Sequence, residues 1–225
     1  MTPGSHVHRT PRFAAQSEVP EMPNRTNSTS DATSQAEKNN PTLAKLTVME
    51  ANSFVGKRFR IGADGQIEKA AAGNHSEWAA VHLTVSTAIE FAQYLEVFSP
   101  EMALVLGTAP GLPEYFSLTW NGIKRTRETF HLANGPGWLL LDYDTDQMPP
   151  SVMQRIDELG GPVAAMEHVW PELKGACRVL KPSSSGGVHK TGEEAPTDIN
   201  GFHLYVLVSD QSKSKEILEI LQRRA

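Results

Sequence analysis

The sequence predicts an α+β fold built around a mostly antiparallel or mixed sheet. Segments typical of strands and of helices follow one another without the strict alternation of a parallel βαβ series. The chain has 225 residues, of which 39% are hydrophobic, so it can form one medium-sized domain with a tail. No internal repeat is visible in it.

Residues 1–41 are predicted to form a disordered tail, and residues 42–225 are predicted to form the domain. The tail is rich in Pro, Ser, Thr, Asn and Gln, and residues 1–40 contain no Ile, Leu, Trp or Tyr. Such a segment cannot bury enough apolar surface to offset the conformational entropy lost on ordering.

The first half of the domain is predicted to contain a hairpin, a helix and a strand. Apolar residues around the turn at residues 63–66 indicate a β-hairpin; they are Leu46, Val48, Phe54, Phe59 and Ile61. Ser86 is expected to cap a helix that ends near Pro100 and carries apolar residues at helical spacing, namely Ile89, Ala92, Leu95 and Phe98. The apolar run 102–106 is predicted to be a buried strand.

The second half is predicted to contain three strands and two helices. Residues 138–141 form an apolar strand entered from the glycine-rich turn 134–137. Ser151 is expected to cap a short helix that ends at Gly160 and Gly161. Further strands are predicted at residues 176–180 and 203–208, and a final helix over Ser214–Arg224.

Composition excludes several classes of protein. A net charge of −5 excludes a uniformly basic nucleic-acid coat but leaves room for a local basic groove. There is no apolar run of about 18 residues and no secretory signal, so no membrane contact is expected. The single Cys177 cannot form an internal disulfide, which favours a cytoplasmic location.

The most informative segment is the end of the strand at residues 138–141, where Asp142 and Asp144 follow directly. In extended backbone, residues i and i+2 point to the same face, so both carboxylates are expected to project together. Two adjacent carboxylates repel each other unless a cation lies between them, and oxygen ligands suit Mg²⁺ or Mn²⁺ held jointly with phosphate. The alternative is a polar turn after a strand.

Three other phosphate or metal motifs can be compared with the sequence. A calcium loop beginning at Asp142 would need glycine and glutamate where Gln147 and Met153 stand, so it is excluded. A haloacid-dehalogenase-type site would need Thr or Val in place of Asp146, so that match is imperfect. Residues 186–191 are not a Walker A loop, because His189 occupies the position of the glycine before the lysine.

A second candidate segment begins at Arg178 and Lys181 and continues into the serine run 183–185. Small hydroxyl residues and glycines let phosphate approach backbone N–H groups, and the two cations would add charge. His203, preceded by Gly201, opens the strand 203–208 and is a candidate phosphate ligand. A flexible serine loop and a structural histidine are the alternatives.

These residues, in this order, resemble the first two catalytic motifs of the archaeo-eukaryotic primase superfamily, particularly primase–polymerases of bacterial plasmids and integrated elements. Residues 42–225 as a whole look like the N-terminal region of such proteins. The matching segments are Arg-Thr-Arg at 125–127, Leu-Leu-Leu-Asp-Tyr-Asp at 139–144 with Met-Pro at 148–149, the serines at 183–185 and the Gly-x-His-Leu-Tyr-Val stretch at 201–206.

The resemblance implies an RRM-like α+β catalytic core beside a smaller α/β part. It also implies template-directed nucleotidyl transfer with two divalent cations, Mg²⁺ or Mn²⁺, about 3.5–4 Å apart. Asp142 and Asp144 would hold metal, and His203 would contact the triphosphate of the incoming nucleotide, with Ser183 or Ser185 nearby.

The same resemblance suggests partners. Arg125, Arg127 and Arg178 would line a groove for template or phosphate, where basic residues supply affinity without sequence specificity. The implied partners are a single-stranded DNA template, nucleoside triphosphates and a helicase of the same mobile element.

The superfamily has a third motif, another aspartate on a later strand, and here the sequence departs from the pattern. The nearby candidate, Asp210, follows His203 by seven residues, roughly 23 Å of extended chain, and the odd spacing turns it to the opposite face. Asp210 is therefore interpreted as a turn residue before the final helix. The expectation is a primase that stops before the third motif and whose activity is doubtful.

Two functions of other classes remain open. One is a non-catalytic remnant that binds single-stranded DNA or a protein partner. The other is a haloacid-dehalogenase-like phosphatase that depends on Asp142.

Overall fold

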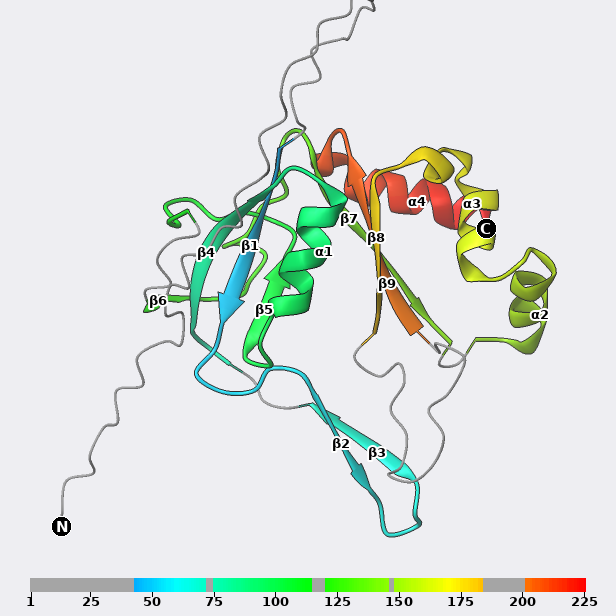
Figure 1. The fold of residues 1–225 in the computed structure, drawn as a ribbon, viewed down its shortest axis with the longest axis horizontal. Coiled ribbons are helices and arrows are strands. Elements are labelled where there is room, and N and C mark those ends of the chain that lie inside the picture. Colours follow the sequence, from blue (N-terminus) through cyan, green and yellow to red (C-terminus); the bar gives the residue numbers. More distant parts are fainter. Residues whose placement is uncertain (1–42, 72–74, 115–119, 146–147, 184–200) are drawn as a thin grey trace, which may run out of the picture. The chain divides into compact units, whose positions relative to one another are not determined.

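The computed structural model describes residues 43–71, 75–114, 120–145, 148–183 and 201–225. The chain divides into two units, Met1–Asn40 and Pro41–Ala225, and all described residues belong to the second unit. The predicted tail, residues 1–41, thus lies outside the described residues. The second unit contains both helices and antiparallel strands (Figure 1), as an α+β fold requires.

One sheet has four strands in the order β5-β1-β4-β6. They are β1 (Ala44–Glu50), β4 (Trp78–Val85), β5 (Met102–Val105) and β6 (Trp120–Ile123), and each pairs antiparallel with its neighbour. The sequence did not indicate β4, because six of its eight residues are buried and it lacks the alternation of a half-exposed strand. The run 102–106 does form a strand, β5, but it is half-buried, since it lies at the sheet edge.

A second sheet has three strands in the order β7-β9-β8: β7 (Gly137–Asp144), β9 (Gly201–Val208) and β8 (Arg178–Pro182). β7 and β9 pair antiparallel along their whole length, from Gly137 opposite Val208 to Asp144 opposite Gly201. The predicted strand 176–180 is shifted toward the C-terminus, because its pairing with β9 begins only at Arg178.

The strands β2 (Lys57–Ile61) and β3 (Ile67–Ala71) form a hairpin of their own. The hairpin predicted around residues 63–66 is confirmed at that turn. Leu46 and Val48, however, lie in β1 and pair with β4, because their buried side chains belong to the core of the larger sheet.

The first helix, α1 (Ala88–Val97), has Thr87 as its N-cap rather than the predicted Ser86. The Glu90 N–H donates to Thr87 Oγ1 at 3.1 Å, and the Glu90 carboxylate accepts bonds from the N–H and hydroxyl of Ser86 at 2.8 and 2.7 Å. Both residues therefore complete the first turn, in a variant of the capping box.

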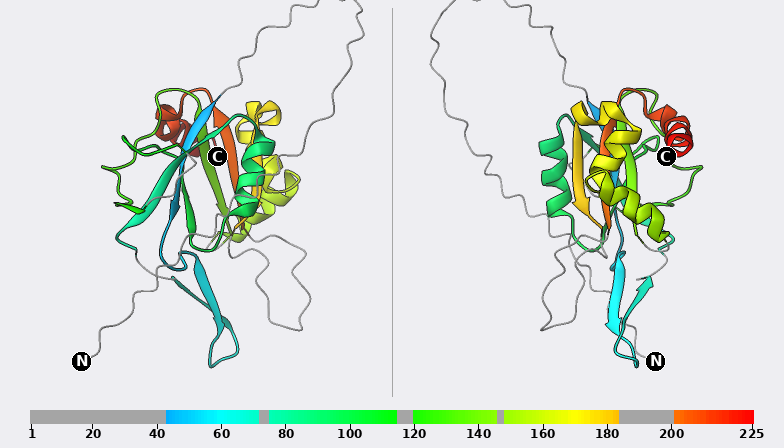
Figure 2. Two further views of the ribbon diagram at one scale, coloured as in Figure 1. Left: turned by 60° about the vertical axis from the view of Figure 1, so that its left-hand side comes forward. Right: turned by 90° about the vertical axis from the view of Figure 1, so that its right-hand side faces the viewer.

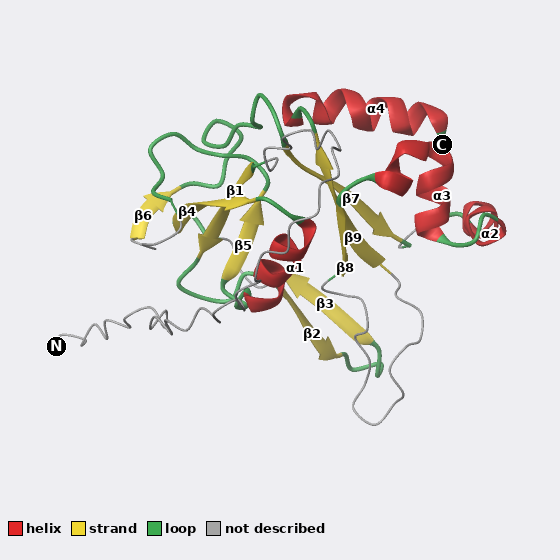
Figure 3. Ribbon diagram, turned by 45° about the horizontal axis from the view of Figure 1, so that its top comes forward, coloured by secondary structure: helices red, strands yellow, loops and turns green. Residues whose placement is uncertain are grey.

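Helices cluster toward the C-terminal half of the domain: α2 (Pro150–Glu158), α3 (Pro162–Val169), the 3₁₀ helices η1 (Pro171–Gly175) and η2 (Gln211–Lys213), and α4 (Ser214–Arg224). The N-cap of α2 is Pro149 rather than Ser151, since the proline pair begins the first turn. The predicted bounds of α4 are confirmed. Figure 3 shows α2, α3 and α4 on the side of the β7-β9-β8 sheet that is remote from β6.

The main core lies where α1 meets both sheets. Phe91 of α1 is fully buried, and its ring centroid lies 4.5 Å from that of Trp138 on β7 and 5.1 Å from that of Tyr205 on β9. Leu46 and Leu83 from β1 and β4 close the same cluster. The opposite face of the β7-β9-β8 sheet packs on α3 and η1, so both faces of this sheet are covered along most of its length.

Candidate functional site

The β7-β9-β8 sheet carries a row of three polar residues across its strands. Asp142 on β7 lies directly opposite His203 on β9, which lies opposite Lys181 on β8. Directly opposed residues of antiparallel strands project from the same face, so a carboxylate, an imidazole and an ammonium group adjoin one another. His203 Nε2 lies 3.4 Å from Asp142 Oδ1; the Asp142 side chain is 62% exposed and that of His203 is 31% exposed.

The next row toward the end of the sheet adds a second carboxylate and a hydroxyl. Asp144 lies opposite Gly201, and the Ser183 N–H donates to the Gly201 carbonyl at 3.0 Å. A Cβ atom at Gly201 would come within 3.0 Å of Ser183 Oγ and 3.1 Å of the Tyr143 carbonyl oxygen. A side chain at this position would therefore crowd both neighbouring strands, and Asp144 and Ser183 lie on either side of the glycine.

The polar rows begin where the apolar core ends. In the row before them, Tyr205 lies between Leu140 and Val179 and packs its ring against Phe91 of α1. Burial and the negative charge of Asp142 raise the pKa of Tyr205 above its ordinary value. The carboxylate of Asp142 thus lies at the boundary between the buried core and solvent.

The C-terminal end of α1 reaches the same row, because Lys181 Nζ donates to the Leu95 carbonyl oxygen at 3.1 Å. The sequence grouped Lys181 with Arg178 as phosphate-binding cations, but the structure separates them. They are three residues apart in an extended strand, so they point to opposite faces. This odd spacing is visible in the sequence. It predicts that only one of the two cations, Arg178 or Lys181, shares a face with His203.

Arg178 lies on the face that packs against α3 and η1. Its guanidinium donates to Glu167 Oε1 at 2.7 Å and to the Leu173 carbonyl at 3.2 Å, which explains why Arg178 is only 30% exposed. The structure therefore places it away from Asp142 and His203.

Arg125 and Arg127 are exposed in the segment that follows β6. Figures 1 and 3 both show β6 far to the side of β7 and β9, so the segment that carries the two arginines begins away from the strands of the polar rows. Ser185, together with Asp146 and His189, lies outside the described residues. Of the two serines expected beside the triphosphate, Ser183 is thus the one that can be placed.

A divalent cation would find two carboxylates here. Within the described ranges, no group of three or more His, Cys, Asp or Glu side chains is arranged to hold a metal ion. Asp142 and Asp144 are exposed and share one face, which fits Mg²⁺ or Mn²⁺ bound by one or two carboxylates and completed by water and phosphate oxygens. Two carboxylates are too few to hold such a cation by protein ligands alone. They are better suited to a cation that is also coordinated by the phosphates of a nucleotide.

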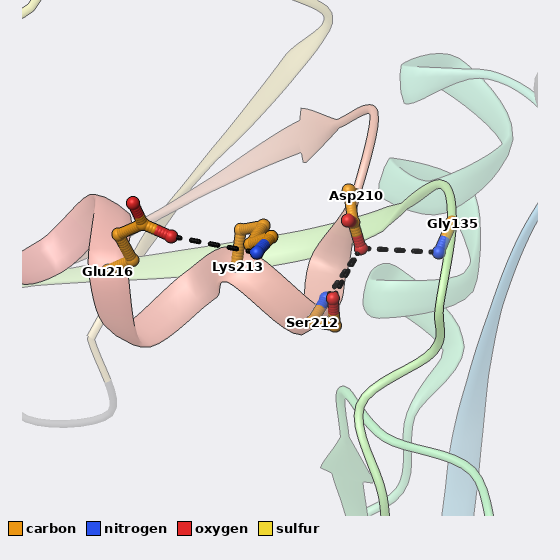
Figure 4. A network of polar contacts seen from close by, with 5 residues as sticks. All are labelled: Gly135, Asp210, Ser212, Lys213 and Glu216. Carbon is orange, nitrogen blue, oxygen red and sulfur yellow. Dashed lines mark hydrogen bonds and ion pairs between the residues drawn. The ribbon is translucent and has the colours of Figure 1, made fainter.

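Asp210 takes no part in this face. Its Oδ1 accepts hydrogen bonds from Ser212 Oγ at 2.7 Å, from Ser212 N at 3.1 Å and from Gly135 N at 3.3 Å (Figure 4). These bonds, that of the Ser212 side chain above all, hold the pKa of Asp210 below its ordinary value. The interpretation of Asp210 as a turn residue before the final helix is confirmed, since it is the N-cap of η2.

No family model, curated protein or solved structure matches this chain. Among the residues that the structure describes, no helix combines the length and the apolar character needed to cross a membrane.

Proposed function

We propose that this chain is a primase–polymerase-type nucleotidyltransferase domain that binds a metal-bound nucleoside triphosphate at the polar end of the β7-β9-β8 sheet. The observation that carries the proposal is the register of the sheet, which aligns Asp142, His203 and Lys181 across three strands on one face. Acidic groups at one end of a row and basic groups at the other are what a cation bound to a polyphosphate requires.

The acidic residues would bind the metal, and the basic and hydroxyl residues would bind the phosphates. Asp142 and Asp144 would hold Mg²⁺ or Mn²⁺ with oxygen ligands. His203 and Lys181 would donate to phosphate oxygens, and Ser183 would add a hydroxyl beside Gly201. When bound, the cation would neutralise charge on the phosphates and polarise the phosphorus–oxygen bonds.

The neighbouring groups favour binding over a purely structural role. Asp142 is mostly exposed, so its carboxylate can exchange His203 for a metal without losing a buried partner. Next to this row, the buried rings of Tyr205 and Phe91 pack against each other and support the strand that carries His203. Ligands held on strands over a packed core are positioned more accurately than ligands on loops.

The sequence resemblance supplies the choice of reaction. Aspartates after an apolar strand, a serine loop and a glycine-preceded histidine occur in the order of the primase superfamily, and the register brings the first and last of these segments side by side. The partner on this proposal is a single-stranded DNA template with nucleoside triphosphates. No third carboxylate lies beside the first two within the described ranges, which favours a nucleotide-binding domain of low polymerase activity.

The proposal is tested by titrating the full chain with a fluorescent deoxynucleoside triphosphate, with and without Mn²⁺, and by assaying primer synthesis on single-stranded DNA. Asp142→Asn keeps an oxygen acceptor for His203 but removes the charge, so we expect it to abolish the Mn²⁺-dependent part of binding. Asp157→Asn, on the exposed surface of α2, is the matched control and should bind like the wild type.

Three results would oppose the proposal. Mn²⁺-dependent binding that survives Asp142→Asn would remove the metal assignment. DNA retention that falls with salt but ignores Mn²⁺ and nucleotide would favour the non-catalytic DNA-binding function. Hydrolysis of a phosphomonoester that is lost in Asp142→Asn would favour the phosphatase.

A further inference from the structure

The β2-β3 hairpin is a two-stranded sheet that pairs with neither of the two larger sheets. Its five register pairs run from Lys57 opposite Ala71 to Ile61 opposite Ile67. Figures 1 and 2 show it as an arm that projects beyond the rest of the domain. A lone hairpin is marginally stable in water, so an arm of this kind gains from a surface that covers it.

The base of the arm is held by two contacts. Before β2, the Val55 N–H donates to the Pro100 carbonyl at 3.0 Å, which joins this stem to the domain. After β3, His75 Nε2 lies 3.2 Å from the Phe54 carbonyl oxygen, which joins the two stems to each other. The arm therefore projects from an anchored base and is not a loosely attached loop.

The two faces of the arm differ in charge. One face carries Arg58 and Arg60 with Glu68, and Arg60 Nε donates to Glu68 Oε2 at 2.7 Å. The other face, which we call the lysine face, consists of Lys57, Phe59, Ile61, Ile67, Lys69 and Ala71. It holds two cations, an aromatic ring and two exposed isoleucines (Ile61 at 55% and Ile67 at 36%), and it holds no acid.

We propose that the lysine face binds single-stranded nucleic acid. Phe59 lies directly opposite Lys69 across the hairpin, so an aromatic and a basic residue are neighbours on this face. Proteins that bind single strands combine cations along the backbone with aromatic side chains on which bases stack. The chain as a whole has a net charge of −5, so the positive charge of the lysine face is a local feature. This local charge is complementary to a polyanion such as nucleic acid.

The arm also lies at the end of the domain that carries the candidate site. Pro100, which anchors the arm, follows α1 closely, and Leu95 in the last turn of α1 accepts the hydrogen bond from Lys181. Figures 1 and 2 show the arm below the ends of β7 and β8 that carry Asp144 and Lys181. The inference rests on the proposed function, because it assigns the single-stranded template to the lysine face of the arm. Binding of single-stranded DNA by the arm can nevertheless be measured without any nucleotide.

The test is fluorescence anisotropy of a labelled oligothymidylate of about 20 nucleotides, longer than a typical single-strand site, with the full chain and without metal or nucleotide. We expect Lys57→Ala with Lys69→Ala to weaken binding at least fivefold and to lower the slope of log affinity against log salt by about 1.4, at about 0.7 per phosphate contact. Phe59→Leu keeps an apolar side chain but removes the ring, and should weaken binding about fivefold.

The control is Arg58→Ala with Arg60→Ala, which removes the same charge from the opposite face and should leave affinity within about twofold of the wild type. Circular dichroism melting of each variant checks that the domain is folded. Equal losses from both faces, unchanged binding in the lysine variant, or a preference for duplex of the same length would each overturn the inference.

The outcome is separable from that of the proposed function. If oligothymidylate binding depends on the lysine face while no Mn²⁺-dependent nucleotide binding is found, the arm is retained and the nucleotidyltransferase is rejected. If nucleotide binding depends on Asp142 while the lysine variant binds DNA normally, the arm is rejected and the nucleotide site is retained.

Discussion

Lys181 is bound to Leu95 by a hydrogen bond of 3.1 Å from Nζ to the carbonyl oxygen in the last turn of α1. The final carbonyls of a helix lack intrahelical donors and carry partial negative charge, so an ammonium group is a natural partner for them. This bond holds Lys181 beside His203 at the edge of the polar rows.

The first prediction concerns this lysine. Lys181→Met removes the charge but keeps an apolar stem, and we expect it to weaken Mn²⁺-dependent nucleotide binding about tenfold, the range of a charge-assisted hydrogen bond. Lys181→Arg should retain most of the affinity. Lys174→Met, in η1, removes the same charge from an exposed position as the control. Wild-type affinity in Lys181→Met would exclude Lys181 from the site.

The second prediction separates Asp210 from the metal-binding acids. Asp210→Ala removes the acceptor of three hydrogen bonds and should lower the melting temperature, whereas Asp210→Asn keeps an acceptor and should lower it less. Because Asp210 is placed away from Asp142, neither variant should change the Mn²⁺ dependence of nucleotide binding. A loss of that dependence in the folded Asn variant would make Asp210 a metal ligand.

The third prediction concerns Gln211, which is fully buried and joins three separate segments. Its Nε2 donates to the carbonyls of Leu106 at 2.5 Å and Trp138 at 2.9 Å, and its Oε1 accepts from Ala133 N at 3.0 Å. Gln211→Leu leaves these backbone groups without partners, so we expect a loss of about 3 kcal/mol in the free energy of unfolding, measured by urea denaturation. Gln222→Leu, on exposed α4, should cost much less.

Gly137 provides an independent check of the same contact. A Cβ atom there would lie 2.6 Å from the Gln211 side chain. Gly137→Ala should therefore displace the Gln211 side chain and destabilise the domain. If Gly137→Ala and Gln211→Leu act through one contact, the double variant should lose less stability than the sum of the single variants.

The fourth prediction is a pH dependence from His82. Burial lowers the pKa of His82 below 6.5, and Lys45 adds to this effect, while Glu114 opposes it. The Ala109 N–H donates to His82 Nε2 at 3.3 Å, which requires the neutral ring. Below pH 6.5 the unfolded chain binds the proton more readily than the folded chain, so this contribution to stability is present above pH 6.5 and is lost as the pH falls toward the lowered pKa.

The measurement is the free energy of unfolding from urea titrations between about pH 7.5 and 5.5, on either side of the ordinary histidine pKa. His82→Gln keeps an acceptor for the Ala109 N–H and cannot titrate, so its stability should fall less over this range. His131→Gln, an exposed histidine, is the control and should follow the wild type. Identical pH curves for the wild type and His82→Gln would contradict the prediction.

Local patterns in the sequence were sufficient for several elements. The bounds of α4 follow from the periodic apolar residues between Ser214 and Arg224, and the turn of the β2-β3 hairpin follows from Asp64 and Gly65. In contrast, β4 and α3 were missed. β4 is buried on both faces and shows no period of two, and α3 is a helix of only eight residues, too short for a clear helical repeat.

The candidate site was predictable in one respect and not in another. That Asp142 and Asp144 share a face follows from the period of an extended chain. That Lys181 and not Arg178 adjoins His203 required the register of β8 against β9, and the ion pair of Arg178 with Glu167 required the packing of α3.

An α+β domain with two acids at the end of an apolar strand could be predicted without a structure, because both features depend on composition and on the local geometry of the chain. Which distant residues meet those acids depends on long-range packing. A shift of the β7-β9 pairing by one residue would turn His203 to the other face, and what prevents that shift is the packing of Trp138 and Tyr205 around Phe91, a long-range contact that no local pattern encodes.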